Sequence, residues 1–526
     1  MYDLLIKGAM IYDGSGSDGF ISDLLIDNGK IIKLRKNISD LAREVIDARG
    51  LVLTPGFIDF HTHSEIYGLK DPYMKARIGQ GITTDLCGNC GIGIFPLNQN
   101  KEYLLPLNND VLGHFDNYSW SDFSSYSNII SGKMGINQAY LCSHAPLRIA
   151  ALGSDSGRAA NDKEIDFMCS LLDDALSQGC MGLSSGLYYA PCSSADRNEL
   201  VRLLKTVKKH DKLFCVHHRI EGPEIVSSIK EVLDLALETG VRLEISHLKI
   251  IGRKYGYLLD DIFNLFDTYI SKGVDVKFDQ YPYHYGSTSL FSLLPAHVLA
   301  LTRNEQMRVL KDEDERKIIK EEMLNPAGWE SLFPVVGPDD ISILSLDQGH
   351  KYDGLSLTEI SKITNTEPLD TLLDILSDEA GAAVMIDITE SEETLKRILA
   401  HPLMCFGTDS LYSTPIPHPR SYSATIHLLQ DYVLRDKIIS FPEAIRKMTY
   451  EGATRLRLKD IGLIKEGYRA DINILSLENL KATATLDKPF VKNDGLEFVI
   501  IGGKIAYERG KFNNTLSGLL LKSEEL

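Results

Sequence analysis

The chain has 526 residues, of which 44% are apolar and 25% are charged, and its formal net charge is −17. This length suits one large domain with a smaller one, and the acidic excess argues against nucleic acid or an anionic membrane as a partner. Residues 1–20 lack the features of a signal peptide, and no apolar run approaches the roughly 18 residues of a membrane span. We therefore expect a cytoplasmic protein whose eight cysteines are free thiols.

Both ends of the chain predict short β-strands joined by tight turns. Asn28-Gly29 lies between two apolar runs, and Gly502-Gly503 lies between two others. Such dipeptides are typical of two-residue hairpins. We expect residues 1–52 and 463–526 to form one small β-sandwich domain built from both termini, with the larger domain inserted between them.

Between residues 53 and 462, apolar runs of strand length alternate with helical patterns. The expected strands are Thr54–Phe60, Thr83–Leu86, Gln138–Cys142, Gly182–Ser184, Leu213–Val216, Arg242–Ile245, Asp275–Phe278 and Met404–Gly407. The expected helices include Glu164–Ser177, Arg197–Lys209, Glu224–Thr239 and Asp260–Lys272. This alternation predicts an α/β fold, the (β/α)8 TIM barrel. A doubly wound open sheet is the alternative, although no glycine-rich phosphate loop follows the first strand.

One segment, 290–349, interrupts this alternation. It contains the charged stretch Arg303–Glu322. We interpret it as an inserted helical lid between the seventh and eighth strands of the barrel.

Side chains that can bind a metal or move a proton follow several of the expected strands. They are His61, His63, Cys90, His217, His247 and Asp409. The carboxyl ends of the strands meet at one face of such a barrel, so these groups are expected to converge there. His61 and His63 are two residues apart on one strand and point to the same side. The set predicts a metal-dependent hydrolase.

The ligand types favour zinc, because a thiolate with imidazoles binds it in preference to magnesium or calcium. Zinc lowers the pKa of a bound water to about 7, and Asp409 is suited to pass the proton of that water to a leaving nitrogen. Singly, each residue also has a structural interpretation, such as a hydrogen-bonded core histidine or, for Asp409, a helix N-cap. Cys87-x-x-Cys90 is a weaker candidate for a redox pair or zinc knuckle, since no second Cys or His pair follows closely.

Motifs along nearly the whole chain carry a resemblance to a known family. They are PGFIDFHTH, GITTDLCGNCGIG, SSGLYYAP, HHRIEG, EISHLK, DQYPYHYGSTSL, GTDS, HPR and GLIKEGYRADINIL. Through them the chain resembles the amidohydrolase superfamily and, within it, the D-aminoacylases (N-acyl-D-amino-acid deacylases). The His-x-His pair marks the superfamily only, whereas GNCG, SHLK, YPY and HPR are more specific. The family fold, a barrel plus a small β-sandwich made by both termini, matches the organisation predicted above.

The resemblance implies a metal arrangement. It assigns a tightly held zinc to Cys90, His217 and His247, and a second, weakly occupied metal position to His61 and His63. Many relatives bridge two metals with a carboxylated lysine. Here the cysteine resembles its replacement, so one strongly bound zinc is expected.

The resemblance also implies substrate contacts. Asp409 is expected between metal and substrate, and the residues matching substrate-holding positions are Tyr189, Lys249, Tyr281, Ser287 and Arg420. Arg420 can bind a free carboxylate with two parallel hydrogen bonds, and Lys249 can supply a second cation. The structural alternative is that Tyr281 packs in the core and Arg420 pairs with an acid.

The activity implied is hydrolysis of the amide bond of a small-molecule N-acyl-D-amino acid to a carboxylate and a free D-amino acid. One alternative is a cyclic-amide hydrolase of the dihydropyrimidinase or dihydroorotase kind, which usually needs a bridging lysine for which this chain has no good candidate. The other is a catalytically inactive scaffold with the same fold.

Overall fold

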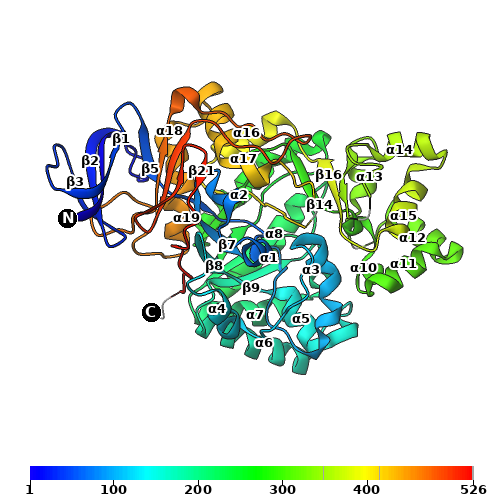
Figure 1. Ribbon diagram of the computed structural model, residues 1–526. Helices are drawn as coiled ribbons and strands as arrows, with labels where there is room; N and C mark the ends of the chain where they lie inside the picture. Colours follow the sequence, from blue (N-terminus) through cyan, green and yellow to red (C-terminus); the bar gives the residue numbers. More distant parts are fainter. Residues whose placement is uncertain (328, 348, 414, 524–526) are drawn as a thin grey trace.

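The computed structural model describes residues 1–327, 329–347, 349–413 and 415–523 (Figure 1). At its centre, parallel strands form a barrel in the order β6-β7-β8/β9-β10-β11-β12-β13-β17. Their bounds are β6 (Phe57–Asp59), β7 (Ile82–Cys87), β8 (Asn137–Tyr140), β9 (Cys142–Ser143), β10 (Gly182–Gly186), β11 (Leu213–His217), β12 (Arg242–Ile245), β13 (Val276–Gln280) and β17 (Met404–Phe406). Residues of β7, β10 and β11 are buried throughout, as expected of parallel strands covered on both faces.

Hydrogen bonds between the first and last strands close the barrel. The Phe60 amide donates to the Phe406 carbonyl at 3.0 Å, and the Asp409 amide donates to the His61 carbonyl at 2.7 Å. The predicted (β/α)8 barrel is therefore confirmed.

A buried arginine also links the first and last strands of the barrel. Arg77, on α2 (Lys75–Ile78), is fully buried and pairs with Asp59 of β6 and with Asp85 of β7, the latter at 2.8 Å. Its Nη1 also donates to the hydroxyl of Thr408, just after β17, at 3.3 Å. One guanidinium thus ties together three neighbouring strands, and its own charge is balanced by the carboxylates that it holds.

Helices cover the outside of the barrel. Four of the predicted ones are α6 (Asp162–Ser177), α7 (Arg197–Lys209), α8 (Ile225–Thr239) and α9 (Leu259–Ser271). The others around the barrel are α1 (Glu65–Lys70), α3 (Leu105–Val111), α4 (Phe123–Ile130), α5 (His144–Leu152), α16 (Glu392–Ala400), α17 (Arg420–His427), α18 (Phe441–Met448) and α19 (Tyr450–Arg455). The Asn161 side chain caps α6 by accepting from the amides of Lys163 and Glu164, so this helix begins where its sequence signals it.

The first predicted strand, Thr54–Phe60, is divided in the structure. Its beginning belongs to β5 (Val52–Pro55), which lies in the sheet of the terminal domain, and its end belongs to β6 of the barrel. Gly56 is the point of division: a Cβ there would lie 2.2 Å from the Thr83 hydroxyl oxygen. The chain can therefore pass this close to β7 only without a side chain.

Strands from both termini form one sheet. Its order is β21-β20-β19-β18-β5-β1-β2-β3, with β4 also paired to β1. The bounds are β1 (Tyr2–Ile11), β2 (Phe20–Asp27), β3 (Lys30–Arg35), β4 (Ala42–Asp47), β18 (Ile472–Leu475), β19 (Leu496–Ile501), β20 (Lys504–Glu508) and β21 (Lys511–Phe512). The sheet folds over an apolar core to which both ends contribute. Asn28-Gly29 and Gly502-Gly503 have positive φ at each residue, which confirms the predicted hairpin turns.

An insertion between β13 and β17 forms a unit of its own (right side of Figure 1). Strands β14 (Tyr285–Ser289), β16 (Ala383–Ile388) and β15 (Ile341–Leu346) make an antiparallel sheet in that order. Its helices are α10 (Ala296–Leu299), α11 (Arg303–Lys311), α12 (Glu313–Leu324), α13 (Leu332–Val336), α14 (Leu357–Thr364) and α15 (Pro368–Asp378). The predicted lid, 290–349, lies within this unit, which also includes the flanking strands β14 and β16.

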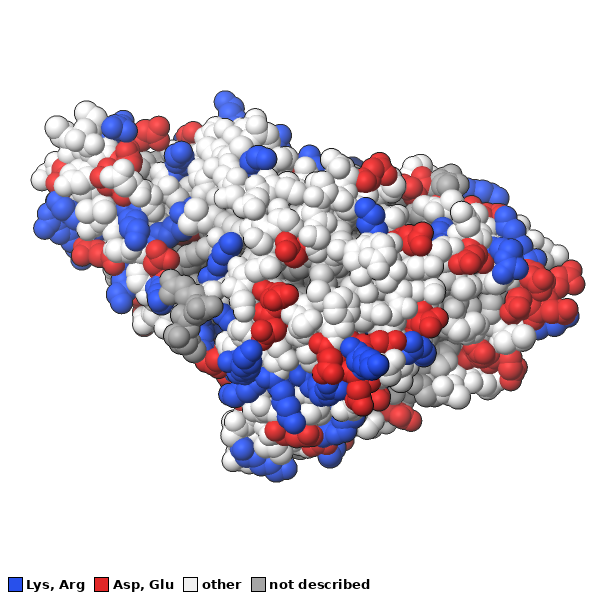
Figure 2. Space-filling model, turned by 90° about the horizontal axis from the view of Figure 1, so that it is seen from below, with Lys and Arg blue, Asp and Glu red and all other residues white. Residues whose placement is uncertain are grey.

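The distribution of surface charge and the length of the helices bear on binding to nucleic acid and membranes. Acidic and basic side chains are interspersed over the face seen in Figure 2. Among the described residues, none of the helices combines the length and apolar character needed to cross a membrane.

Candidate active site

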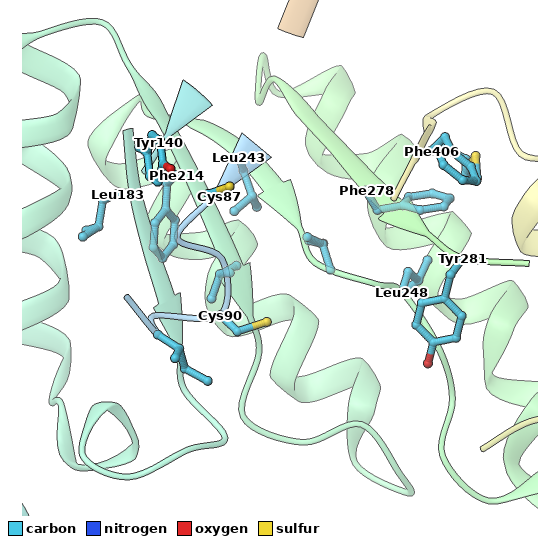
Figure 3. Close-up of a cluster of buried hydrophobic side chains, with 14 of the residues drawn as sticks. Cys87, Cys90, Tyr140, Leu183, Phe214, Leu243, Leu248, Phe278, Tyr281 and Phe406 are labelled. Carbon is cyan, nitrogen blue, oxygen red and sulfur yellow. The ribbon is translucent and has the colours of Figure 1, made fainter. Parts of the chain in front are cut away.

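The predicted site residues lie at the carboxyl ends of the barrel strands. His61 and His63 follow β6, Cys90 lies on the loop after β7, His217 ends β11, His247 follows β12, and Asp409 follows β17. All are buried, with 9% or less of each residue exposed. Cys87, by contrast, packs among apolar side chains that include Tyr140 and Phe214 (Figure 3).

The backbone is unusual at three of these positions. Cys90, His247 and Asp409 have φ values of 54°, 32° and 51°. Residues other than glycine rarely adopt this left-handed region, and doing so has an energetic cost. The side chains of all three converge on the histidine cluster, so the strained backbone positions are concentrated at the site.

The sulfur of Cys90 is the centre of the cluster. Its Sγ lies 3.4 Å from His247 Nε2, 3.9 Å from His217 Nδ1 and 3.2 Å from His61 Nε2. In a tetrahedral zinc site, bonds of about 2.3 Å to sulfur and 2.05 Å to nitrogen separate these ligand atoms by about 3.6 Å. The separations to His217 and His247 bracket that value, so each pair suits two zinc ligands. The described group with Cys90 whose donor atoms all lie within 4.8 Å of one another is His61, Cys90 and His247.

Electrostatics favours the metal-binding form of the cysteine. Burial raises the pKa of the Cys90 thiol, but the imidazoles of His61 and His247 outweigh it and hold this pKa well below its ordinary value. The thiolate is the form of cysteine that binds metals.

The carboxylate of Glu221, not identified from the sequence, supports the two histidines from behind. Its oxygens lie 3.5 Å from His217 Nε2 and 3.4 Å from His247 Nδ1, the nitrogens that face away from Cys90. Such a carboxylate fixes the orientation and tautomer of metal-binding imidazoles. The available signal was its place four residues after His217 in the HHRIEG motif.

Asp279, at the end of β13, was also missed, and it supports His61. Its Oδ1 lies 2.9 Å from His61 Nδ1 and accepts a hydrogen bond from the His247 amide at 2.9 Å. One buried carboxylate therefore fixes both an imidazole and the strained turn at His247.

The Asp409 carboxylate lies between the imidazoles of His61 and His63 on one side and the Arg420 guanidinium on the other. Its Oδ1 is 3.5 Å from His61 Nε2 and 3.4 Å from His63 Nε2, and its Oδ2 is 3.1 Å from Arg420 Nη1. Burial raises the pKa of Asp409, but Arg420 and His63 outweigh it and hold this pKa well below its usual range. Asp409 is thus held in its ionised form.

Three of the predicted substrate residues, Arg420, Tyr281 and Ser287, lie together next to Asp409. Arg420 is fully buried, its Nη2 donates to the Ser287 carbonyl at 2.9 Å, and its guanidinium stacks on the Tyr281 ring. Among the described residues, Arg420 Nε, Tyr281 Oη and Ser287 Oγ are buried without a hydrogen-bond partner, while Arg420 Nη1 has the 3.1 Å contact with Asp409. Unpartnered buried donors of this kind are typical of groups that await a ligand.

The other two predicted substrate residues lie beside His217 and His247. The Tyr189 ring packs against His217 with centroids 4.8 Å apart, and its hydroxyl lies 3.3 Å from Thr288 Oγ1. Lys249 Nζ donates to Glu221 at 2.7 Å and lies 2.9 Å from His247 Nδ1. Lys249 is therefore already paired with an acid beside His217 and His247.

Comparisons with known proteins agree with this geometry. A sequence model of the amidohydrolase family matches residues 44–212 and 368–507. The chain is 30% identical to an N-acyl-D-aspartate deacylase of Alcaligenes xylosoxydans xylosoxydans, over 96% of this chain and 92% of that protein. Its fold is similar to that of an N-acyl-D-glutamate deacylase of Bordetella bronchiseptica, solved with zinc and a phosphonate inhibitor (26% identity, 99% of each chain, TM-score 0.84). It is also similar to a solved D-aminoacylase (27% identity, 99% of this chain and 100% of the other, TM-score 0.85). The chain therefore belongs to the amidohydrolase family, as its motifs imply.

Proposed function

We propose that the protein is a zinc-dependent deacylase that hydrolyses N-acyl-D-amino acids to a carboxylate and a free D-amino acid. The observation that carries this proposal is the 3.1 Å contact between Asp409 and Arg420 beside the Cys90 cluster. In an N-acyl amino acid the carboxylate and the amide nitrogen are bonded to the same carbon. A guanidinium that binds the carboxylate therefore brings the amide next to the proton-accepting Asp409. The named activities of the similar deacylases support the same substrate class.

The metal arrangement proposed is one tightly bound zinc held by Cys90, His217 and His247. Its support is the fit of their separations to tetrahedral zinc and the zinc found in the similar Bordetella deacylase. His61 and His63 would hold a second, weaker metal, with Cys90 close enough to share its sulfur. When bound, zinc lowers the pKa of a coordinated water and polarises the amide carbonyl.

The protein's own side chains supply the remaining steps. Arg420 orients the substrate by binding its carboxylate through the unpartnered Nε, while Nη1 keeps its contact with Asp409. Asp409 accepts a proton from the attacking water on its carboxylate and returns it to the leaving nitrogen. The Tyr281 hydroxyl, also unpartnered, donates a hydrogen bond to the carbonyl oxygen as negative charge develops there. The cytoplasmic location stays a prediction of the sequence.

The test is a hydrolysis screen of N-acetyl-D- and N-acetyl-L-amino acids, with hydantoin and dihydrouracil included as cyclic amides. We expect release of free D-amino acid, detected with an amine-reactive dye, and little turnover of the L series. Turnover of the cyclic amides alone would refute the deacylase assignment in favour of the cyclic-amide alternative. Absence of all turnover with zinc bound would favour an inactive scaffold.

A further inference from the structure

Two buried carboxylates next to the proposed substrate site have no cation of their own. Asp387 is on β16 and Glu390 follows it, and they are 3% and 1% exposed. Among the described residues, no lysine, arginine or histidine nitrogen lies within 4.0 Å of either one. The nearby cations are already engaged, since Lys249 pairs with Glu221 at 2.7 Å and Arg420 with Asp409 at 3.1 Å.

Asp387 faces the site rather than the interior of the insertion. It lies directly opposite Gly286 of β14, and its Oδ1 is 3.0 Å from where a Cβ of Gly286 would be. The unpartnered Tyr281 hydroxyl is 3.3 Å from the same point. The absence of a side chain at Gly286 thus lets a carboxylate and a substrate-facing tyrosine hydroxyl both lie close to the same backbone position.

Glu390 lies at the mouth of the barrel beside β13. Its Oε1 accepts from Gln280 Nε2 at 3.1 Å, whereas its Oε2 is buried without a partner among the described residues. The Ile250 backbone amide also stabilises this carboxylate, but both donors are neutral, and the unpartnered Oε2 is able to accept from a ligand.

The ionisation of both groups reflects the missing cation. Burial raises the pKa of Asp387 to about 6 and that of Glu390 to about 8, and the positive charge of Lys249 opposes this rise only in part. The charges of Lys249 and Arg420 both lower the pKa of Asp387, but each of these cations is paired with another acid. A buried acid of this kind is stabilised in its charged form when a cation arrives.

We propose that Asp387 and Glu390 form a subsite for a positively charged substrate side chain, so that the enzyme prefers N-acyl derivatives of basic D-amino acids such as D-lysine and D-arginine. This proposal rests on the proposed deacylase function. Arg420 takes the α-carboxylate, and the side chain carries its cation to the two acids. An acidic side chain would instead meet two carboxylates and be repelled.

The test compares N-acetyl-D-lysine with N-acetyl-D-norleucine, which has nearly the same carbon chain without the ammonium group, and with N-acetyl-D-glutamate. We expect kcat/KM to be at least about tenfold higher for the lysine derivative than for the norleucine derivative, given the usual strength of buried charge pairs. We expect the glutamate derivative to be the poorest substrate. Asp387→Asn should lower the lysine-to-norleucine ratio by about tenfold, and Glu390→Gln is a second variant that tests the same subsite.

Asp378→Asn is the matched control, because it removes the same charge from an exposed position on α15 of the same insertion and should leave the ratio unchanged. Equal or better turnover of norleucine would overturn the subsite while leaving the deacylase function standing. If no acyl amino acid is hydrolysed, the deacylase function fails, and calorimetric titration with free D-lysine and D-norleucine still decides the subsite. Tighter binding of D-lysine supports it, and equal binding overturns it.

Discussion

The carboxylate of Glu221 gives the sharpest test of how the metal centre is built. Glu221→Gln keeps the size of the side chain and leaves one oxygen to accept from Lys249, but it replaces the other oxygen with an amide that cannot accept from an imidazole. At least one of the contacts to His217 (3.5 Å) and His247 (3.4 Å) is therefore lost, together with the negative charge. Loss of such a supporting contact weakens metal binding by about 10- to 100-fold, which is about 1.4–2.8 kcal/mol.

The assay is competition for zinc between the protein and a chromophoric chelator at fixed pH. We expect the Kd for zinc to rise by at least about tenfold in Glu221→Gln and to stay unchanged in Glu224→Gln, an exposed glutamate three residues further along the same loop. An unchanged Kd in a Glu221→Gln variant with normal circular dichroism and unfolding midpoint would refute the role given to this carboxylate.

Four further substitutions test other parts of the molecule. Cys90→Ala should remove the tightly bound zinc after gel filtration, and unchanged metal content by mass spectrometry would show that the ligand set is wrong. Asp409→Ala should abolish turnover while zinc stays bound, so substantial residual activity would contradict its role as base. Arg77→Met leaves two buried carboxylates unpaired and should lower the free energy of unfolding in urea by about 3–5 kcal/mol; a loss below 1 kcal/mol would contradict the account of barrel closure. Burial and Lys447 lower the pKa of His401 to about 4, so its neutral form stabilises the fold above pH 6.5 and that contribution is lost as the pH falls toward 4. His401→Phe should therefore lose less stability than the wild type between pH 7 and pH 5 in urea unfolding, and an equal loss would count against this assignment.

The barrel could be predicted because its strands carry a strong local signal. Leu213–Val216 and Arg242–Ile245 are short strand-like runs, each followed within two residues by a histidine, and the structure places both as neighbouring barrel strands. Cys90 and the histidines follow such runs, so their convergence follows from the architecture alone. The choice of which histidines hold the zinc came from the resemblance, and it stays a prediction.

What the sequence did not reveal depends on contacts between distant segments. Asp279 looks like an ordinary polar residue at a strand end, and its role comes from His61, more than 200 residues earlier. Strand β14 has the sequence YGSTS, which lacks an apolar alternation. It is ordered by pairing with β16 almost 100 residues later, so a local sequence pattern does not indicate it.

The joint made by β5 and β18 affects how the chain folds during synthesis. β5 pairs with β18 through Leu53 and Ile474, about 420 residues apart, and at 5–20 residues per second the ribosome needs roughly 20–80 s to make that stretch. For this time β1–β5 have an unpaired sheet edge while the barrel emerges, and open edges of this kind recruit other strands. The terminal domain thus starts to form before the barrel but completes its sheet after it. Chaperone dependence is therefore expected to arise from the unpaired edge of β5 rather than from the barrel.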